Sequence, residues 1–417
     1  MKLTPVKGTN DYLPEEVALR DRLQDIILRD YRAAGFRRIS TPILEDIENL
    51  DHSDGGENLA LIFKVLKRGE KLISALSEAS DVSAVKENDL ADMGLRYDLT
   101  LPLSRYYANN RAKLPLPMKV IQLDRVYRAE RPQKGRLREF VQCDIDIIGT
   151  SSYTAEVELI LTTAKALSDI GLDDFTVRIN DRSLLKAMIA SCGIAEEQSD
   201  SVCIELDKLD KIGWDGVSSE LYEKGIYGEA TEKLKTLMSR TPFTIDDAES
   251  AVPGSPAAQN LRMIMSAVAE LDPSLRVVYD PNLVRGQGYY TGTVFEVSSG
   301  SFGSSVAGGG RYDGLIGKFT GENIPAVGFS IGFERIFSIL SAKGGAVPGV
   351  RKGVVVFYDG GDPDAFISAE RTAVTLRDEY DVTLMTEPPQ KKFGKTLGSL
   401  RQSGYFGYFR DGGIKPL

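Results

Sequence analysis

The sequence predicts a mixed α+β fold in three parts, and three observations carry this prediction. Residues 125–148 contain two strand patterns around a charged turn, which is typical of an antiparallel hairpin. Residues 181–272 show a long, charged helical pattern. After a glycine-rich linker at 341–352, strand and helix patterns alternate over residues 353–417, which favours a small α/β module. We therefore expect an α+β core over residues 1–340, interrupted by a helical insertion that takes no part in the chemistry.

Hydrophobic spacing predicts the elements of the core. Residues 15–34 carry an apolar stripe at helical spacing, and Gly35 follows at a position where glycine commonly ends a helix. Apolar and polar side chains alternate over residues 95–101, which predicts an extended segment. A further helix is expected after the hairpin, ending near Gly171, and strand patterns return from Arg276.

Composition and charge argue against several classes of protein. The chain has 417 residues, with 51 Lys and Arg against 60 Asp and Glu, so its formal net charge is −9. This charge disfavours indiscriminate attraction to polyanions, and any contact with nucleic acid must use local basic patches. Cys143, Cys192 and Cys203 lack the spacing of a zinc site or a disulfide framework. We find no signal-like or membrane-spanning apolar run and expect a cytoplasmic protein without a membrane partner.

The common glycine motifs that hold nucleotide phosphates do not occur in this sequence. Neither GxxxxGK(S/T) nor GxGxxG is present. The single histidine, His52, lies in the polar stretch DHSDGGEN. A catalytic site that uses histidine as the base for a nucleophile is therefore disfavoured. If the chain binds a nucleotide, arginines and backbone groups must hold it.

The second arm of the hairpin concentrates polar chemistry on one face. Side chains alternate between the two faces of a strand, so one face carries Phe140, Gln142, Asp144 and Asp146. The other face is apolar and carries Val141, Cys143, Ile145 and Ile147. Arginines that suit phosphate or carboxylate lie nearby, at Arg128, Arg131, Arg136 and Arg138. A ring, an amide, acids and arginines together favour a nucleotide and a second polar ligand. The alternative is the solvated face of an antiparallel hairpin.

Three further clusters follow the helical insertion: LVRGQGYYTGTVFEV at 283–297, GGGRYDGL at 308–315 and AVGFSIGFERI at 326–336. Paired tyrosines before a strand can serve packing, and glycine triplets can form turns. Arg335 is different because it lies in the opening turn of an expected helix, where backbone N–H groups and the helix dipole favour an anion. A phosphate partner is therefore plausible at this helix start.

Together these segments resemble the histidyl-tRNA synthetase family, a class II aminoacyl-tRNA synthetase family, from KGTNDYLP at the N-terminus through FERI. The hairpin is similar to class II motif 2 and FERI to motif 3. LVRGxxYYTGTVFE and GGGRYD are similar to the two histidine-specific signatures. The resemblance implies a core of mostly antiparallel sheet flanked by helices, a helical insertion, and a small C-terminal α/β domain that binds the anticodon.

The resemblance also implies a two-step reaction. Histidine would attack the α-phosphate of ATP to give histidyl-adenylate and pyrophosphate, and the acyl group would then pass to the 3′ end of tRNA(His). Mg²⁺ would accompany ATP. No metal site built from protein side chains is assigned. Residues 15–45 match the region that forms the subunit interface in the family, which implies a homodimer.

Family positions imply roles for individual residues. Arg128 and Arg285 would act in catalysis at the α-phosphate, and ATP would be bound by Arg128, Glu130, Phe140 and Arg335. Histidine would be bound by Asp98, Thr100, Arg128, Gln142, Asp146, Arg285, Tyr289 and Tyr290. Arg131 and Gln133 would approach the acceptor end of the tRNA.

Two departures and one alternative accompany the resemblance. Gln287 and Gly288 stand where the family commonly has Leu-Asp, and the C-terminal module is short. The alternative is the non-catalytic, synthetase-like regulatory subunit of ATP phosphoribosyltransferase, which typically lacks the C-terminal module and much of the ATP and tRNA machinery. The RAERPQKGR turn, Arg285, Arg335 and the C-terminal segment favour the ligase. A diverged ligase that acts on something other than tRNA is a third possibility.

Overall fold

A computed structural model describes residues 1–51, 61–77, 85–132, 136–284, 289–300, 305–343 and 351–417. Contacts within the chain define two units, and each is described by itself. The larger contains residues 1–10 and 26–343, and the smaller contains residues 11–25 and 344–417.

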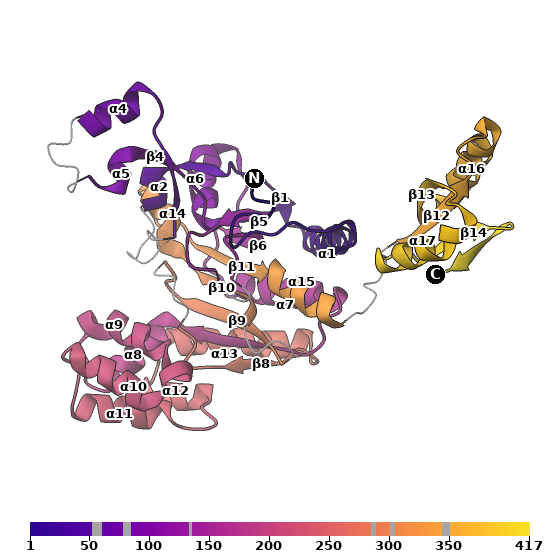
Figure 1. Ribbon diagram of the computed structural model, residues 1–417. Helices are drawn as coiled ribbons and strands as arrows, with labels where there is room; N and C mark the ends of the chain where they lie inside the picture. The colour runs from indigo at the N-terminus through magenta and orange to yellow at the C-terminus, as the bar shows by residue number, and fades with distance from the viewer. Residues whose placement is uncertain (52–60, 78–84, 133–135, 285–288, 301–304, 344–350) are drawn as a thin grey trace. The chain divides into compact units, whose positions relative to one another are not determined.

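The larger unit is built on a mostly antiparallel sheet, which contains eight strands within the described residues (Figure 1). Their order is β1 (Arg37–Arg38), β5 (Met118–Tyr127), β6 (Glu139–Ile148), β11 (Ala326–Gly332), β10 (Ser305–Arg311), β9 (Thr293–Ser299), β7 (Phe175–Asp181) and β8 (Val277–Tyr279). Adjacent strands from β5 to β7 pair antiparallel, whereas β1 and β8 pair parallel at the two edges. The expected class II core architecture is thereby confirmed.

The predicted hairpin is formed by β5 and β6, which pair from Met118 opposite Ile148 to Tyr127 opposite Glu139. On β6 the apolar residues expected on one face, Val141, Cys143, Ile145 and Ile147, are all buried. Helix α7 (Thr154–Asp169) packs against β6 and β11, and α15 (Phe333–Lys343) packs against β6 and β10. Burial of one face leaves the alternate residues of β6 for the site described below.

A smaller antiparallel sheet, with the order β2 (Leu44–Asp46), β4 (Ala91–Leu95) and β3 (Phe63–Leu66), carries α2 (Ile47–Asp51). Helices α4 (Glu70–Ser77) and α5 (Glu87–Leu90) flank a segment outside the described residues. The extended segment expected over 95–101 is wrong beyond Leu95, because β4 ends at that residue and helix α6 (Thr100–Asn110) begins five residues later. Leu99, Leu101 and Leu103 are all buried. Tertiary packing therefore decides the conformation here, because the alternation of apolar and polar residues over 95–101 is short.

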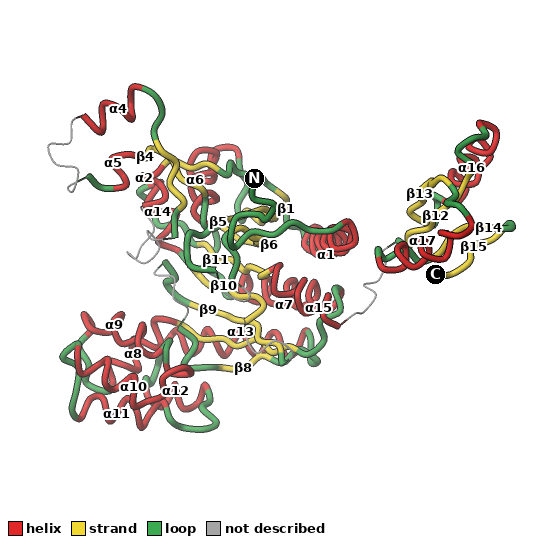
Figure 2. The backbone as a smooth tube through the Cα atoms, in the orientation of Figure 1, coloured by secondary structure: helices red, strands yellow, loops and turns green. Residues whose placement is uncertain are grey.

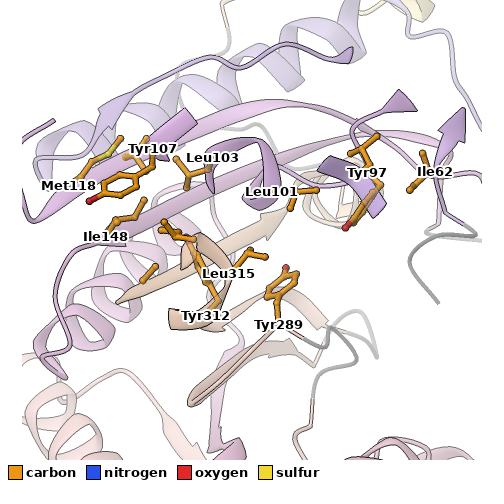
Figure 3. Packing of buried hydrophobic residues seen from close by; sticks show 14 of the residues in the cluster. Ile62, Tyr97, Leu101, Leu103, Tyr107, Met118, Ile148, Tyr289, Tyr312 and Leu315 are labelled. Atoms are coloured by element: carbon orange, nitrogen blue, oxygen red, sulfur yellow. The ribbon is translucent and has the colours of Figure 1, made fainter. Parts of the chain in front are cut away.

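One apolar cluster joins α6 to α14 (Asp313–Thr320) and to the residues before β9. Figure 3 shows Leu101 and Leu103 of α6 with Tyr289, Tyr312 and Leu315 in this cluster. The cluster fixes Tyr312, whose hydroxyl donates to Asp146 on the polar face of β6.

Glycines end two of the predicted helices as expected. Helix α1 (Pro14–Ala33) is followed by Gly35 at φ +85°, and α7 by Gly171 at φ +89°. Such positive φ values suit glycine because it lacks a Cβ.

Residues 182–271 fold into six α-helices: α8 (Arg182–Ser191), α9 (Ser199–Leu206), α10 (Leu209–Glu223), α11 (Glu229–Met238), α12 (Ile245–Ala251) and α13 (Pro256–Leu271). Figure 2 shows this segment as helices and loops. Helix α8 contacts β7, and α13 packs against β7, β8 and α7. The segment therefore joins the sheet at the β7–β8 edge.

In the smaller unit, residues 351–417 form a four-stranded sheet with two helices. Its order is β13 (Tyr380–Thr386), β12 (Lys352–Tyr358), β14 (Gly407–Arg410) and β15 (Gly413–Pro416), and the helices are α16 (Pro363–Leu376) and α17 (Gln390–Gln402). The central strand β12 is parallel to both neighbours, and the chain closes with the antiparallel pair β14–β15. Within the described residues, no helix combines the length and the apolar character required to span a bilayer.

Candidate active site

A polar cavity of about 480 Å³ lies over β6, β11 and β10. The four residues predicted for the polar face of β6 all line it: Phe140, Gln142, Asp144 and Asp146. The sequence pattern therefore marked a cavity wall and not a solvated hairpin face. Side chains from the start of α6, the segment after β5, the region before β9 and the start of α15 also line it.

Several glycines contribute bare backbone to the part of the wall formed by β10 and β11. A Cβ on Gly309 would lie 2.0 Å from the carbonyl oxygen of Gly328, and a Cβ on Gly328 would lie 1.9 Å from Asp146 Oδ1. A Cβ on Gly310 would lie 2.8 Å from Cδ1 of Tyr290. Real side chains do not tolerate such distances, so these glycines allow the strands and the pocket side chains to approach closely.

Arg128 follows β5 and enters the cavity from the hairpin. Its backbone N–H donates to the carbonyl oxygen of Arg138 at 2.9 Å, which extends the pairing of the two arms. Its Nε donates to the carbonyl oxygen of Tyr97 at 3.1 Å, and its guanidinium lies 4.9 Å from the centroid of the Phe140 ring. The arginine is thus oriented by a carbonyl and an aromatic face, as a group that binds an anion must be.

Three carboxyl groups lie deep in the same cavity. Asp98, Asp144 and Asp146 are each at most 4% exposed. Asp98 accepts a hydrogen bond from the Leu101 backbone N–H at 3.3 Å, and Asp146 accepts one from the Tyr312 hydroxyl at 2.7 Å. Burial raises the pKa of Asp98 to about 6 and that of Asp146 to about 7. Burial, with the nearby charge of Asp146, also holds the pKa of Asp144 well above its usual range.

These raised pKa values predict how stability depends on pH. The folded chain keeps a proton on Asp146 up to about pH 7, whereas the unfolded chain releases it near pH 3.8. This contribution to stability is therefore complete below the unfolded pKa and is lost as the pH rises through about 7. Its size is on the order of 4 kcal/mol. We expect the urea midpoint of the ligand-free chain to fall between pH 5 and pH 8, and to fall less in Asp146→Asn. An identical pH dependence in both proteins would contradict the assignment.

Paired aromatic rings close one side of the cavity. The rings of Tyr289 and Tyr290 are 4.8 Å apart, and Tyr289 lies 6.2 Å from Tyr312 in an edge-to-face arrangement. Figure 3 shows Tyr289 and Tyr312 side by side. Burial raises the pKa of the Tyr289 and Tyr312 hydroxyls well above its usual range, so both stay protonated and can donate.

The start of α15 also lines the cavity, through Glu334 and Arg335. Arg335 donates through Nη1 to the carbonyl oxygen of Ser305, and Oε1 of Glu334 accepts from the Val141 backbone N–H at 3.2 Å. Glu130 pairs with Arg136 at 3.3 Å. Arg128, Arg335 and Phe140 line the same cavity as the buried acids, so groups that suit both of the expected ligands meet in one place.

The cavity brings together ten of the candidate residues: Asp98, Thr100, Arg128, Glu130, Phe140, Gln142, Asp146, Tyr289, Tyr290 and Arg335. Arg131 is exposed and is not part of the lining. Arg285 and Gln133 lie outside the described residues, as do Gln287 and Gly288.

Sequence reasoning assigned no role to several residues that line the cavity. Asp144 shares the alternation of Gln142 and Asp146, and Tyr312 stands in the glycine-rich cluster, so each carried a signal. Asp207, at the end of α9, also lines the cavity. The helical insertion therefore reaches the cavity wall at this position. No pattern in the sequence marked Asp207.

Comparison with known proteins identifies the family. The model of the family described as Histidyl-tRNA synthetase matches residues 8–336, which include every residue that lines the cavity. The chain belongs to the histidyl-tRNA synthetase family. Within this family, a histidine–tRNA ligase of Leifsonia xyli subsp. xyli is 43% identical over 371 residues, covering 86% of this chain and 84% of the relative. A histidine–tRNA ligase of Christiangramia forsetii is 35% identical, covering 94% of this chain and 88% of the relative.

Solved structures share the fold of this histidyl-tRNA synthetase family member. The histidyl-tRNA synthetase from Nostoc sp. PCC 7120 superposes with a TM-score of 0.79 at 28% identity, covering 98% of this chain and 91% of that one. A Bacillus halodurans protein described as an ATP phosphoribosyltransferase regulatory subunit/histidyl-tRNA synthetase has a TM-score of 0.76 at 21% identity, covering 96% of this chain and 97% of that one. The second likeness shows the fold alone.

Proposed function

We propose that the chain is a histidine–tRNA ligase, which activates histidine with ATP and transfers it to the 3′ end of tRNA(His). One observation carries this proposal beyond family membership. A single cavity combines an oriented arginine on an aromatic face with a buried set of acids and tyrosine hydroxyls. The first part suits a nucleotide phosphate, and the second suits an amino acid with an ammonium group and an imidazole.

The first step joins the two ligands. An oxygen of the histidine carboxylate attacks the α-phosphorus of ATP, the bond from that phosphorus to the bridging oxygen breaks, and pyrophosphate leaves. Negative charge builds on the α-phosphate, so a fixed cation lowers the barrier. Arg128 has this role in the proposal. By the resemblance, Arg285 approaches the same phosphate from the other side.

The ligands are held by the groups already described. Phe140 and Arg335 hold the adenine ring, and Glu130 contacts the nucleotide. Asp98, Thr100 and Gln142 surround the α-amino group. Asp146, Tyr289 and Tyr290 surround the imidazole, which has one donor and one acceptor nitrogen when neutral. Asp146 accepts hydrogen bonds, and the tyrosine hydroxyls can donate them.

In the second step the terminal ribose hydroxyl of the tRNA attacks the carbonyl carbon of the adenylate, and AMP leaves. Arg131 and Gln133 approach the acceptor end in this proposal. Arg131 is well placed for such a role because it is exposed beyond the cavity lining. The C-terminal module, residues 353–417, binds the anticodon.

Magnesium enters with ATP in this proposal. Within the described residues no group of three or more His, Cys, Asp or Glu side chains could hold a metal ion. The ion would therefore take most of its ligands from phosphate oxygens and water, as Mg²⁺ commonly does. It would supply charge neutralisation on the triphosphate.

Assembly and location extend the proposal. Residues 15–45 form the subunit interface of a homodimer, and the protein acts in the cytoplasm. The proposed domains are a core over 1–340, interrupted by an insertion at 181–272, a linker at 341–352 and an anticodon-binding module at 353–417.

The regulatory-subunit alternative shares the fold, so fold similarity does not separate the two functions. Sequence does favour the ligase, because curated relatives up to 43% identical over most of the chain are named histidine–tRNA ligases. The Bacillus halodurans protein is 21% identical in sequence, so its similarity shows a shared fold and does not indicate a function for this chain.

The test is ATP–pyrophosphate exchange with each of the twenty amino acids, followed by charging of total tRNA. We expect exchange with histidine alone and stable charging of tRNA(His). Histidine binding without exchange would instead favour the regulatory subunit, and exchange with a different amino acid would reject the proposed pocket assignment.

A further inference from the structure

Three buried acceptor oxygens in the cavity lack donors. Asp98 Oδ2, Gln142 Oε1 and Asp144 Oδ1 have no hydrogen-bond partner within the described part of the chain. All three residues line the same cavity. A buried acceptor without a donor costs about 1–3 kcal/mol, so three in one place indicate a ligand that supplies donors.

The neighbours of Asp144 on the adjacent strands leave one of its carboxylate oxygens facing the cavity. It stands opposite Ser330 of β11 and opposite Gln122 of β5 in the sheet register. The polar atoms of Gln122 are occupied, since its amide donates to the carbonyl oxygen of Leu99 at 2.8 Å and accepts from Thr41 at 3.3 Å. Ser330 lies between the two polar residues of β6, because its hydroxyl accepts from Gln142 Nε2 at 3.2 Å and also bonds Asp144. The second carboxylate oxygen of Asp144 is left to the cavity.

The charges of the three residues favour a cation. Burial favours the protonated forms of Asp98 and Asp144, whereas a cation beside them favours the ionised forms. Two carboxylates and an amide oxygen then provide only acceptors. A primary ammonium group has three N–H donors and a positive charge. Its number of donors and its charge match the three orphan oxygens.

We propose that Asp144 is a third acceptor for the α-ammonium group of histidine, completing with Asp98 and Gln142 a three-oxygen cradle that selects ligands carrying this group. The inference rests on the proposed function and deepens it, because it gives Asp144 a binding role that neither the sequence pattern nor the resemblance assigned to this residue. Thr100, which lines the same cavity, then supports the cradle from the start of α6.

The test compares two ligands on three proteins. Histidine and 3-(imidazol-4-yl)propionate differ only in the α-amino group, and calorimetry on the full chain measures the affinity of each. The variant is Asp144→Asn, which keeps the shape but removes the charge. The matched control is Asp181→Asn, another buried aspartate, which caps α8 outside the cavity and where asparagine caps equally well.

We expect Asp144→Asn to weaken histidine binding by about 10- to 100-fold, the range for a hydrogen bond to a charged group, and to leave the propionate within about threefold. The preference for histidine over the propionate should therefore fall by about 10-fold or more, as in a double-mutant cycle. The same variant should raise the KM for histidine in pyrophosphate exchange and leave the KM for ATP unchanged. Asp181→Asn should keep the wild-type preference.

Equal losses for both ligands, or an unchanged preference, would overturn the cradle and leave Asp144 with a structural role. If Asp144→Asn does not fold, Asp144→Ser carries the same comparison, because it retains a small polar group but no charge. Failure of the proposed function gives a different result, since the wild-type chain would then show no histidine-dependent exchange whatever the ligand preference of the variants.

Discussion

Replacing Arg128 by alanine is expected to reduce histidine-dependent pyrophosphate exchange by about 100- to 1000-fold, mainly in kcat, while the chain stays folded. The guanidinium is positioned by the Tyr97 carbonyl oxygen and the Phe140 ring before any ligand binds. A cation fixed in advance stabilises charge that develops in the transition state without reorganisation. Its removal also withdraws the positive charge that lowers the pKa of Asp98, so the KM for histidine should rise as well.

The measurement is exchange kinetics with histidine and ATP varied in turn, together with a thermal melt of each protein. Arg128→Lys should recover only part of the activity, because an ammonium retains the charge but not the planar fork. Arg125→Ala is the matched control. Arg125 lies on β5, three residues before Arg128, pairs with Glu139 at 3.3 Å and stands outside the cavity lining. Exchange by Arg128→Ala within tenfold of the wild type would contradict the role.

Replacing Gly309 by alanine is expected to lower the free energy of unfolding by about 3 kcal/mol or more, and to abolish histidine binding. The new Cβ would lie 2.0 Å from the Gly328 carbonyl oxygen and 2.8 Å from Cα of Phe329. Both contacts are to backbone, so no side chain can rotate away. Strands β10 and β11 would have to separate in the middle of the sheet, beneath the cavity.

Urea denaturation followed by circular dichroism measures this effect, with histidine binding measured by calorimetry. Gly314→Ala is the matched control, since Gly314 lies in α14 and its Cβ would approach Cγ2 of Thr291 no closer than 3.9 Å. That change should leave stability unchanged or raise it, because alanine favours helix over glycine by about 1 kcal/mol. If Gly309→Ala matches the stability of the control, the close strand approach has no energetic importance.

The polar face of β6 could be predicted because a strand has one simple period. Once residues 139–148 are extended, Phe140, Gln142, Asp144 and Asp146 must share a face whatever the rest of the chain does. The same argument fails for residues 95–101. There, buried Tyr97 and Leu99 lead into α6, and the short alternation comes from a connection packed between elements.

Contacts across long sequence distances could not be predicted from periodicity. The hydrogen bond from Tyr312 to Asp146 depends on the strand order β6–β11–β10, and that order is a property of the whole fold. Asp207 reaches the cavity from a helical segment for a similar reason. Roles for single residues came from the resemblance. Periodicity indicated only that a nucleotide and a second polar ligand were plausible.

The glycine-built wall has a consequence for the entropy of ligand binding. A pocket lined by long side chains must immobilise them each time a ligand enters, at about 0.5–1.5 kcal/mol for each rotamer-rich side chain. Gly308, Gly309, Gly310 and Gly328 have no rotamers to lose. Their conformational freedom is given up earlier, when the strands form, because glycine loses more backbone entropy on folding than any other residue. On this side of the pocket the conformational entropy is therefore lost during folding and not during ligand binding, so the ligand binds to a surface that is already rigid.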